Sequence, residues 1–581
     1  YARRVKRIFP ALILVLALSF VFAWFVLFAD ELKQLGNHVL RAAVFLSNFV
    51  LWRESGYFDN AAETKPLLHL WSLGIEEQFY VVWPLIVWSI WRLKAWRWQL
   101  MCVLAVTSFA WNVYQSQHDL THDFYSPLTR FWELLCGALL AYPYTASRQP
   151  NHSVGGVGSA SAQIRTVLGA LLLVMAIFLI NSDQRFPGAW ALLPVVGAVL
   201  VISGGGQTWV SQTIFANPFA VWIGTISYPL YLWHWPIFSY ARIIEGGTPS
   251  LAFRVSAIGA SIALAWLTFK WIEKPLRFSW TFRYKTMVLV FAMAGLGSLG
   301  YVTNKMNGYP MRAVMQQQVM HVGDISHDEF HNYFQQHFSP CEEPSIQKSA
   351  EVWRGMVRCF QSKPDAPVNL AILGDSHAEH LFLGLAEALP HLNVAFYTKG
   401  ALPVLGASEF QVIFKHVLST ESIHSVLIAA NWEGKLKEPG APEKFVMDFD
   451  QTLKALRAAD KRVFVMTDLP QFDFDPQRCK FQRPLTQSTQ CDEPRQAYIT
   501  ERQVYLPALQ RVQNLNPGTQ LLDVSDLMCT DHVCSMTRDK QLLYRDNNHL
   551  NILGSQFVGA QIAAKLKLTQ LSHPTGQTQQ P

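Results

Sequence analysis

The sequence predicts a bundle of membrane-spanning helices followed by a water-soluble α/β domain built on a parallel sheet. Half of the 581 residues are hydrophobic, 15% are charged and the mean hydropathy is +0.13, which excludes a disordered or wholly soluble chain. Long apolar runs are confined to residues 1 to about 306, whereas six of the eight cysteines lie beyond that point. The net charge of +6 is modest, so composition does not favour a nucleic-acid partner.

Nine apolar runs in the first part of the chain predict spanning helices. They lie at about residues 8–29, 72–91, 100–116, 127–145, 166–181, 188–204, 218–241, 251–269 and 286–303. The shorter runs need flanking residues to reach the roughly 20 that a bilayer crossing takes. Because nine is odd, the two ends of this region are expected on opposite sides of the membrane.

The charges between these runs predict the orientation. If the first run leaves the cytoplasm, the inner loops hold Arg3, Arg4, Lys6, Arg7, Arg92, Lys94, Arg97, Arg148, Arg165, Lys270, Lys274, Arg277, Arg283 and Lys285. The outer loops then hold Asp30, Glu31, Glu54, Asp59, Glu63, Asp119 and Asp123. The positive-inside rule therefore predicts a cytoplasmic start, and nine crossings place the following domain outside.

Residues 37–53 are apolar but short and contain Arg41, and a full crossing there would reverse the parity. We expect a partly embedded or re-entrant segment, which membranes tolerate where protein or a cavity covers the backbone. The chain starts with Tyr-Ala-Arg-Arg, which is neither an initiator methionine nor a signal peptide, so further sequence is expected upstream.

The cysteines of the second part fall into close sequential pairs. They are Cys341, Cys359, Cys479, Cys491, Cys529 and Cys534. This pattern predicts three local disulfides and an oxidising compartment, although other connectivities remain open. A metal site is the alternative, but the spacings show no CxxC or paired His and Cys. Cys102 and Cys136 lie in apolar runs and are expected to be small buried hydrophobic residues.

Charged and imidazole side chains within the apolar runs are functional candidates, because they are costly in a membrane unless paired or hydrated. They are Glu76, Glu77, Arg130, Glu133 and His234. Structural explanations exist for Glu77, Arg130, Glu133 and His234. Arg130 and Glu133 are three residues apart on one helix face and suit an ion pair. Glu77 suits a solvated helix end, and His69 and His234 suit hydrogen bonding at the interface.

Six strings of the apolar region carry a resemblance to a known family. They are RRVKRIFP (3–10), LSNFVLW (46–52), LLHLWSLGIEEQFYVVWP (67–84), SPLTRFWELLCGALLA (126–141), SYPLYLWHWP (227–236) and EKPLR (273–277). In this order they resemble the acyltransferase-3 family of membrane-bound acyltransferases, over residues 1 to about 278. Members of that family carry an acyl group, commonly acetyl from acetyl-CoA, towards a sugar on the far side of the membrane.

The resemblance implies a donor-binding site in the membrane domain. Its RRxxR pattern is Arg3, Arg4 and Arg7, and its SxxxE pattern is Ser72 and Glu76. Independently of the resemblance, closely spaced guanidiniums suit the phosphates of coenzyme A, although they also suit a simple cytoplasmic anchor. We expect the same site to include Arg130, Glu133 and His234.

The sequence departs from this family at its start. The family's N-terminal motif, a basic residue followed ten positions later by a histidine considered catalytic, would lie upstream of Arg3 and is absent here. Two upstream spans would bring the total to eleven and keep the RRxxR loop on the cytoplasmic side.

The run VNLAILGDSHAEHLFLGLAEAL predicts a buried strand, a Gly-Asp-Ser turn and an amphipathic helix that starts near Ser376. A serine at such a turn lies near the positive end of the helix, where its own N–H can stabilise an oxyanion. Further strands are expected at residues 424–431 and 462–469, and Asp546 and His549 lie in a loop before another helix. The alternation predicts a parallel sheet with its site at the carboxyl ends of the strands.

This order of blocks resembles the SGNH hydrolase family, over residues 341–572. The resemblance implies that Ser376 attacks or accepts an acyl group, that His549 removes its proton and that Asp546 orients the imidazole. The N–H groups of Ser376 and Gly400, with the Asn431 side chain, would form the oxyanion hole. His377 and His380 are alternative bases, but we expect them to line the first helix. Residues 573–581 are expected to be a disordered tail.

An acyltransferase-3 domain joined through an extra span and linker (279–340) to an SGNH domain resembles the bacterial O-antigen acetyltransferases. The resemblance implies an inner-membrane enzyme with its C-terminal domain in the periplasm. It would transfer acetyl from cytoplasmic acetyl-CoA, by way of Ser376, to a hydroxyl of a surface glycan such as lipopolysaccharide O-antigen. No bound cofactor, metal or nucleic acid is expected. The alternatives are a peptidoglycan O-acetyltransferase, a membrane-tethered esterase and a transporter of lipid-linked sugar.

Overall fold

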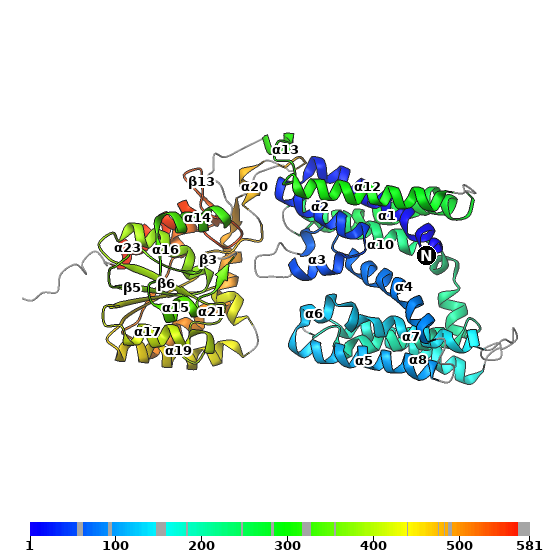
Figure 1. Cartoon of the computed structure of the whole chain (residues 1–581), viewed down its shortest axis with the longest axis horizontal. Helices are drawn as coiled ribbons and strands as arrows, with labels where there is room; N and C mark the ends of the chain where they lie inside the picture. Colours follow the sequence, from blue (N-terminus) through cyan, green and yellow to red (C-terminus); the bar gives the residue numbers. More distant parts are fainter. Residues whose placement is uncertain are drawn as a thin grey trace, which may run out of the picture. The chain divides into compact units, whose positions relative to one another are not determined.

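The computed structural model divides the chain into two compact units, Tyr1–Met315 and Gln316–Pro581 (Figure 1). It describes residues 1–54, 62–90, 96–146, 159–181, 184–245, 248–279, 284–316, 327–353, 356–437, 440–474, 476–481, 483–485 and 491–566. The predicted tail at 573–581 lies outside the described residues, and so do Asp59, Arg92, Lys94, Arg148 and Arg283 of the predicted loops.

The first unit is helical. Its α-helices are α1 (Ala2–Val26), α2 (Ala29–Ala43), α3 (Ser47–Glu54), α4 (Leu70–Ile90), α5 (Arg97–His118), α6 (Leu120–Tyr125), α7 (Pro127–Ala146), α8 (Ala160–Leu179), α9 (Leu192–Gly204), α10 (Pro218–Glu245), α11 (Leu251–Thr268) and α12 (Lys285–Lys305). Short 3-10 and π-helical segments are η1 (Ala62–Thr64), η2 (Gly188–Ala191), η3 (Ser211–Phe215), η4 (Phe269–Glu273) and η5 (Pro275–Ser279). A short helix, α13 (Ala313–Gln316), stands at the boundary of the two units.

Each of the nine predicted apolar runs coincides with a helix, namely α1, α4, α5, α7, α8, α9, α10, α11 and α12. Within the described part of the chain, four helices are long and apolar enough to cross a membrane by length and composition. These are α1, α8, α11 with its continuation to Arg277, and α12. The unit therefore carries membrane helices, and the full count of nine crossings stays a prediction.

The short apolar segment at 37–53 is divided between α2 and α3, which are separated by a break where Phe45 has a φ of +58°. At 1.5 Å per residue, α2 is only about 22 Å long, which is less than the hydrocarbon core of a bilayer. The geometry thus gives two short helices in place of one span. Partial embedding in the membrane stays a prediction.

Small residues let helices of the first unit approach closely. A Cβ on Gly36 of α2 would lie 2.7 Å from the Gly300 carbonyl oxygen of α12, and one on Gly300 would lie 2.5 Å from the Gly36 oxygen. Such small-residue contacts replace the hydrophobic driving force that is missing between helices in lipid. The predicted extra helix, α12, therefore packs within the first unit.

The second unit is built on a seven-stranded sheet with the order β1-β4-β6-β5-β7-β8-β10. The strands are β1 (Ser339–Pro340), β4 (Cys359–Gln361), β5 (Leu370–Gly374), β6 (Val394–Thr398), β7 (Ser425–Ala429), β8 (Arg462–Met466) and β10 (Gln520–Leu522). The five strands from β6 to β10 are parallel, as predicted, while β4 pairs antiparallel with both β6 and β1. Smaller ribbons pair β2 (Val352–Trp353) with β3 (Met356–Val357), β9 (Asp492–Pro494) with β11 (Val533–Ser535), and β12 (Thr537–Arg538) with β13 (Gln541–Leu542).

Helices cover both faces of this sheet. Figure 1 shows α16 (Ser376–Ala388) and α23 (Ile552–Leu566) over one face, and α17 (Gln411–Ser419) and α19 (Ala441–Ala458) over the other. The remaining helical segments are α14 (His327–His337), α15 (Pro344–Ser349), η6 (Ser408–Phe410), α18 (Trp432–Leu436), α20 (Gln477–Lys480), α21 (Arg495–Leu515) and α22 (Ser525–Met528). Each face has its own cluster of buried apolar side chains, which is the three-layer arrangement expected of a mostly parallel sheet.

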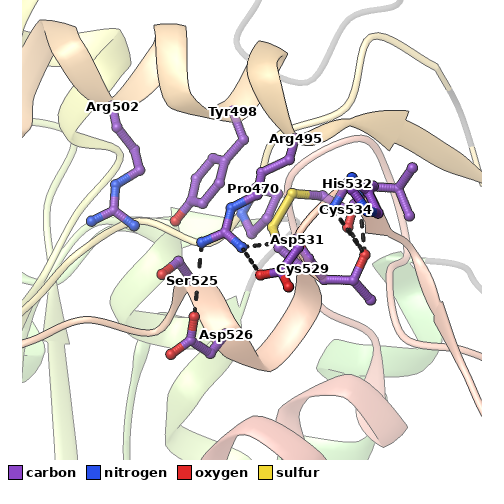
Figure 2. Close-up of a disulfide and its surroundings, with 12 residues drawn as sticks. Pro470, Arg495, Tyr498, Arg502, Ser525, Asp526, Cys529, Asp531, His532 and Cys534 are labelled. Atoms are coloured by element: carbon purple, nitrogen blue, oxygen red, sulfur yellow. Dashed lines mark hydrogen bonds and ion pairs between the residues drawn. A yellow bond between two sulfur atoms is a disulfide. The ribbon is translucent and has the colours of Figure 1, made fainter.

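All six cysteines of the second unit form disulfides between sequence neighbours, as predicted: Cys341–Cys359, Cys479–Cys491 and Cys529–Cys534. Figure 2 shows the last of these beside Arg495, whose Nη1 donates a 2.9 Å hydrogen bond to the Thr530 carbonyl oxygen. The same guanidinium pairs with Asp531 at 3.5 Å and Asp526 at 4.0 Å. Cys102 and Cys136 are half-buried free thiols.

Candidate active site

The turn between β5 and α16 positions Ser376 at the first residue of a helix. Gly374 is required just before it, because a Cβ there would lie 1.6 Å from the Ala429 carbonyl oxygen of the neighbouring strand. Asp375 caps the helix by accepting the His377 N–H at 2.9 Å. Its carboxylate also accepts the Asn431 N–H, at 3.0 Å and 3.2 Å. The turn is therefore fixed to the end of β7 as well as to its own helix.

The structure brings the three predicted triad residues together. Nε2 of His549 lies 2.8 Å from the Ser376 hydroxyl, and Nδ1 of His549 lies 2.8 Å from Oδ2 of Asp546. The other carboxylate oxygen of Asp546 accepts the backbone N–H groups of Asn548 and His549 at 2.9 Å and 2.6 Å. Asp546 thus holds both its own loop and the His549 imidazole in place. These contacts form the hydrogen-bonded chain by which a carboxylate orients a base and the base takes a proton from a serine.

The base of this chain is buried, and its surroundings favour the neutral imidazole. Burial lowers the pKa of His549 to about 4, even though the neighbouring Asp546 carboxylate favours the charged form. A neutral Nε2 can accept the serine proton, whereas an imidazolium cannot. The buried site therefore stays competent for proton transfer in mildly acidic solution.

We expect the Ser376-dependent hydrolysis of p-nitrophenyl acetate by the full chain to be retained at pH 5.5 and to fall with a midpoint near pH 4. The rate falls towards low pH because the neutral, active form of His549 exists above its pKa in the folded protein. That form is lost as the pH falls through this pKa. A profile of kcat/KM against pH, with recovery measured after return to pH 7, checks this. A midpoint near the ordinary histidine value of about 6.5 would contradict it.

The two further oxyanion donors that the resemblance implies, Gly400 and Asn431, have hydrogen-bond partners of their own in the structure. The Gly400 N–H donates to Oε1 of Glu351 at 2.6 Å. The Asn431 side-chain oxygen accepts the Gly434 N–H at 2.8 Å and a hydrogen bond from Gln471 at 3.2 Å. Gly400 and Asn431 both follow strands next to β5, so they lie at the expected edge of the sheet. Their donation to an oxyanion stays a prediction.

A second imidazole and carboxylate, which were not predicted to form a pair, meet beside the triad. Nδ1 of His377 lies 2.9 Å from Oδ1 of Asp468, and the Trp432 N–H donates to Oδ2 at 2.7 Å. Burial alone would lower the pKa of His377, but Asp468 more than offsets this and raises it. The pair connects the start of α16 to the end of β8. As expected, His377 and His380 lie on the first helix, and both are buried.

In the first unit, Arg4 pairs with the acidic residues of α4. Its guanidinium lies 3.0 Å from Glu76, contacts Glu77 more closely still, and stands 3.7 Å over the Tyr80 ring. Glu77 is only 7% exposed, so the expectation of a solvated helix end was wrong. The sequence could not show this, because the partner that α1 supplies is more than 70 positions away. Arg3 and Arg7 of the same pattern are exposed.

Ser72 and His234 lie in one cluster of polar side chains between α4 and α10. The Ser72 hydroxyl is 3.0 Å from the Tyr231 hydroxyl, and Tyr231 also donates to the His69 carbonyl oxygen. The His69 and His234 rings are 5.6 Å apart. Since Glu76 is one helical turn from Ser72 on α4, the predicted SxxxE residues and His234 share one region of the bundle.

Arg130 and Glu133 form the ion pair that their spacing suggested. Nη1 of Arg130 lies 3.2 Å from Oε1 of Glu133 on the same face of α7. The guanidinium also lies 5.6 Å from the Trp71 ring and 5.7 Å from the Phe186 ring. These contacts fit a structural ion pair within α7. A role of Arg130 and Glu133 in donor binding stays a prediction.

With this geometry in view, comparison with known proteins identifies both units. Residues 1–270 match the model of the acyltransferase domain, and residues 340–564 match that of the SGNH domain fused to acyltransferase-3 domains. The chain is an acyltransferase-3 domain fused to an SGNH domain. The fold predicted for each part is thereby confirmed.

The SGNH-fused chain also resembles individual proteins. It is 28% identical over 286 residues to the peptidoglycan O-acetyltransferase OatA of Listeria monocytogenes, covering 48% of this chain and 46% of that protein. The chain spans about half the length of the curated relatives it matches. Among solved structures, the periplasmic domain of the lipopolysaccharide acetyltransferase from Salmonella ser. Paratyphi A matches 42% of this chain and all of that domain, with 15% identity and a TM-score of 0.28.

Proposed function

We propose that this chain is an O-acetyltransferase that moves acetyl from cytoplasmic acetyl-CoA across the membrane to a hydroxyl of a surface glycan. The observation that carries the proposal is the assembled Ser376–His549–Asp546 chain in a domain fused to an acyltransferase-3 domain. A hydrolase needs no multi-helix acyltransferase domain. A protein that brings a donor and an acceptor together from two compartments does need one.

The triad geometry supports a covalent relay in the second unit. The Ser376 oxygen attacks the acyl carbonyl while its proton moves to Nε2 of His549, and the donor departs with that proton. The acyl-serine then meets a glycan hydroxyl, which gives its proton to His549 and forms the new ester bond. The bond between Ser376 and the acyl carbon breaks, and His549 returns the proton to the serine. Asp546 stabilises the imidazolium in both halves.

Donor binding is proposed at the start of α1. Arg3 and Arg7 are exposed, and their planar guanidiniums suit the pyrophosphate and 3′-phosphate of coenzyme A. Arg4 contributes differently, because its guanidinium is paired with Glu76 and Glu77. We therefore assign phosphate contacts to Arg3 and Arg7 and an organising role to Arg4.

Replacing Arg3 and Arg7 together with glutamine is expected to raise the KM for acetyl-CoA at least about tenfold, since each lost charge-assisted hydrogen bond is worth about 1.5 kcal/mol or more. Hydrolysis of p-nitrophenyl acetate should not change, because it bypasses the donor site. Arg165→Gln is the matched control, because Arg165 is a half-buried arginine on α8 whose Nε donates to the Ser161 carbonyl oxygen. An unchanged KM in the double variant would refute the donor assignment.

The second unit is proposed to lie in the periplasm of a bacterial cell. Three disulfides suit an oxidising compartment, and the positive-inside pattern with nine crossings leads to the same side. Lipid-linked glycans are exposed on that side, whereas acetyl-CoA is cytoplasmic. The fusion of two domains is thus explained by reactants that never share a compartment.

The proposed acceptor is a sugar of lipopolysaccharide O-antigen, as the sequence resemblance implies. Peptidoglycan is the second candidate, because OatA of Listeria monocytogenes is named a peptidoglycan O-acetyltransferase. Mass spectrometry of both glycans, from cells with and without the gene, tests the choice. Loss of acetyl from O-antigen alone is expected, loss from peptidoglycan alone selects the second candidate, and no change in either would overturn the function.

A membrane-tethered esterase is the alternative from another class of enzyme. It predicts rapid release of acetate when the purified full chain is mixed with an acetylated glycan and no acceptor. The proposed transferase predicts slow release there, together with the appearance of acetyl on glycans in cells that carry the gene.

A further inference from the structure

A carboxylate occupies the Gly400 N–H, the backbone donor that the resemblance to the SGNH family assigns to the oxyanion hole of Ser376. Gly400 stands two residues beyond the end of β6, and the neighbouring Lys399 N–H donates to the Gly374 carbonyl oxygen at 2.9 Å, directly before the nucleophile turn. Oε1 of Glu351 accepts the Gly400 N–H at 2.6 Å. The Gly400 N–H therefore already donates to an anionic oxygen, in the place of the hydrogen bond that an oxyanion would accept from it.

Glu351 is held there by a second, independent contact. Nη1 of Arg358 donates to Oε2 of Glu351 at 3.0 Å, and the Arg358 backbone N–H donates to the Glu351 carbonyl oxygen at 2.8 Å. The same guanidinium forms a two-pronged contact with Glu379 at 3.1 Å and 2.6 Å. Glu379 is buried on α16, one helical turn after Ser376. The carboxylate of Glu351 is thus anchored to the helix that carries the nucleophile.

The anchor is itself stable near neutral pH. Burial alone would raise the pKa of Glu379, but the Arg358 guanidinium overcomes this and holds that pKa well below its usual range. Glu379 therefore remains charged and keeps Arg358 in place. The Glu351 side chain, by contrast, is 35% exposed, so it can meet a molecule that arrives from solvent.

The arrangement has a chemical consequence for an acyl-serine. An N–H that donates to a carboxylate is not available to a developing oxyanion, and the nearby negative charge opposes that oxyanion as well. Attack on the acyl carbon is slow while Glu351 stays in place, whether the attacking oxygen belongs to water or to a sugar. A polyol differs from water because several linked hydroxyls can bind a carboxylate at once.

We propose that Glu351 is a specificity-determining residue that selects a glycan acceptor over water. Its carboxylate covers the Gly400 N–H until sugar hydroxyls donate hydrogen bonds to it and draw it away. The freed N–H then donates a hydrogen bond to the oxyanion that forms when a further sugar hydroxyl attacks, with the proton of that hydroxyl passing to His549. This inference rests on the proposed acyl-Ser376 and adds the residue that protects it from hydrolysis.

The test is hydrolysis of p-nitrophenyl acetate by the purified full chain without any acceptor. Glu351→Ala removes the covering carboxylate and is expected to increase the rate about tenfold, a part of what one oxyanion donor contributes. Glu351→Gln keeps a neutral acceptor on the N–H, so a smaller increase is expected. The Glu351→Gln variant also tests the proposal if the alanine variant does not fold. Asp526→Asn, at an 81% exposed carboxylate, is the matched control and should not change the rate.

In cells, the same Glu351→Ala variant should acetylate the surface glycan less than the wild type, because acetyl is lost to water. Unchanged or slower hydrolysis in the folded Glu351 variants would overturn the proposal. The Ser376→Ala variant separates this failure from that of the proposed function. If Ser376→Ala hydrolyses the ester as fast as the wild type, the relay itself fails, whatever Glu351 does.

Discussion

Replacement of Ser376 by alanine is expected to abolish glycan acetylation, with a loss of at least about 10³-fold in rate. The hydroxyl is the atom that His549 contacts at 2.8 Å, and the residues beside it offer no equivalent nucleophile in the same hydrogen-bonded chain. The substitution removes a small oxygen atom at the start of α16, so the fold should be retained. Mass spectrometry of the glycan from cells that express each variant measures the effect.

Ser408→Ala provides the matched control, because Ser408 is an exposed serine of the same unit that lies outside the triad. Wild-type acetylation is expected of it. His549→Gln should resemble Ser376→Ala, since the two residues act as one unit and their effects do not add. Full acetylation in Ser376→Ala cells would mean that the membrane domain transfers acetyl to the glycan directly.

Replacement of Arg4 by alanine is expected to cause the second large loss, through stability as well as activity. The substitution leaves Glu77 buried without its guanidinium, and breaking a buried ion pair in this way costs about 3 kcal/mol. The tie between α1 and α4 is lost with it, and Ser72 lies on that same helix. We expect a lower melting temperature of the purified chain and an acetylation rate reduced at least about 100-fold.

A double variant separates the structural role of Arg4 from donor binding. Adding Glu77→Gln to Arg4→Gln removes the uncompensated charge, so the melting temperature should recover most of the way. If Arg4 organises the bundle, much of the acetylation returns with it. If the melting temperature recovers but acetylation stays absent, Arg4 binds the donor directly, as the RRxxR resemblance implies.

The sequence was sufficient for the elements whose signals are local. The buried strand, the Gly-Asp-Ser turn and the helix at Ser376 are adjacent in the chain, and Asp546 and His549 are three residues apart. The triad itself was anticipated from the resemblance of these blocks to the SGNH family, because Ser376 and His549 are 173 residues apart. The apolar runs predicted helices, because a helix in lipid must satisfy its backbone within the segment. Disulfides between neighbouring cysteines are also short-range features.

The contacts that sequence reasoning missed are long-range. Arg4 and Glu77 meet only because α1 packs beside α4, and Glu77 alone looked like a solvated end. Glu351 reaches Gly400 from 49 residues away, and Asp468 reaches His377 from 91 residues away. Asp468 does follow a buried strand at the same edge of the sheet, which is a usable signal. Glu351 lies in a connecting segment, where no pattern in the sequence indicates its contact with Gly400.

The most direct measurement of a trans-membrane relay uses sealed inverted vesicles that contain the full chain. Radiolabelled acetyl-CoA is added to the outer, cytoplasmic face, and the acetylated peptides are then mapped. We expect the label on the peptide that contains Ser376, protected from added protease until the vesicles are opened, and absent in the Ser376→Ala variant. Label of equal amount on the Ser376→Ala protein, or a second unit that protease digests in intact vesicles, would contradict the relay.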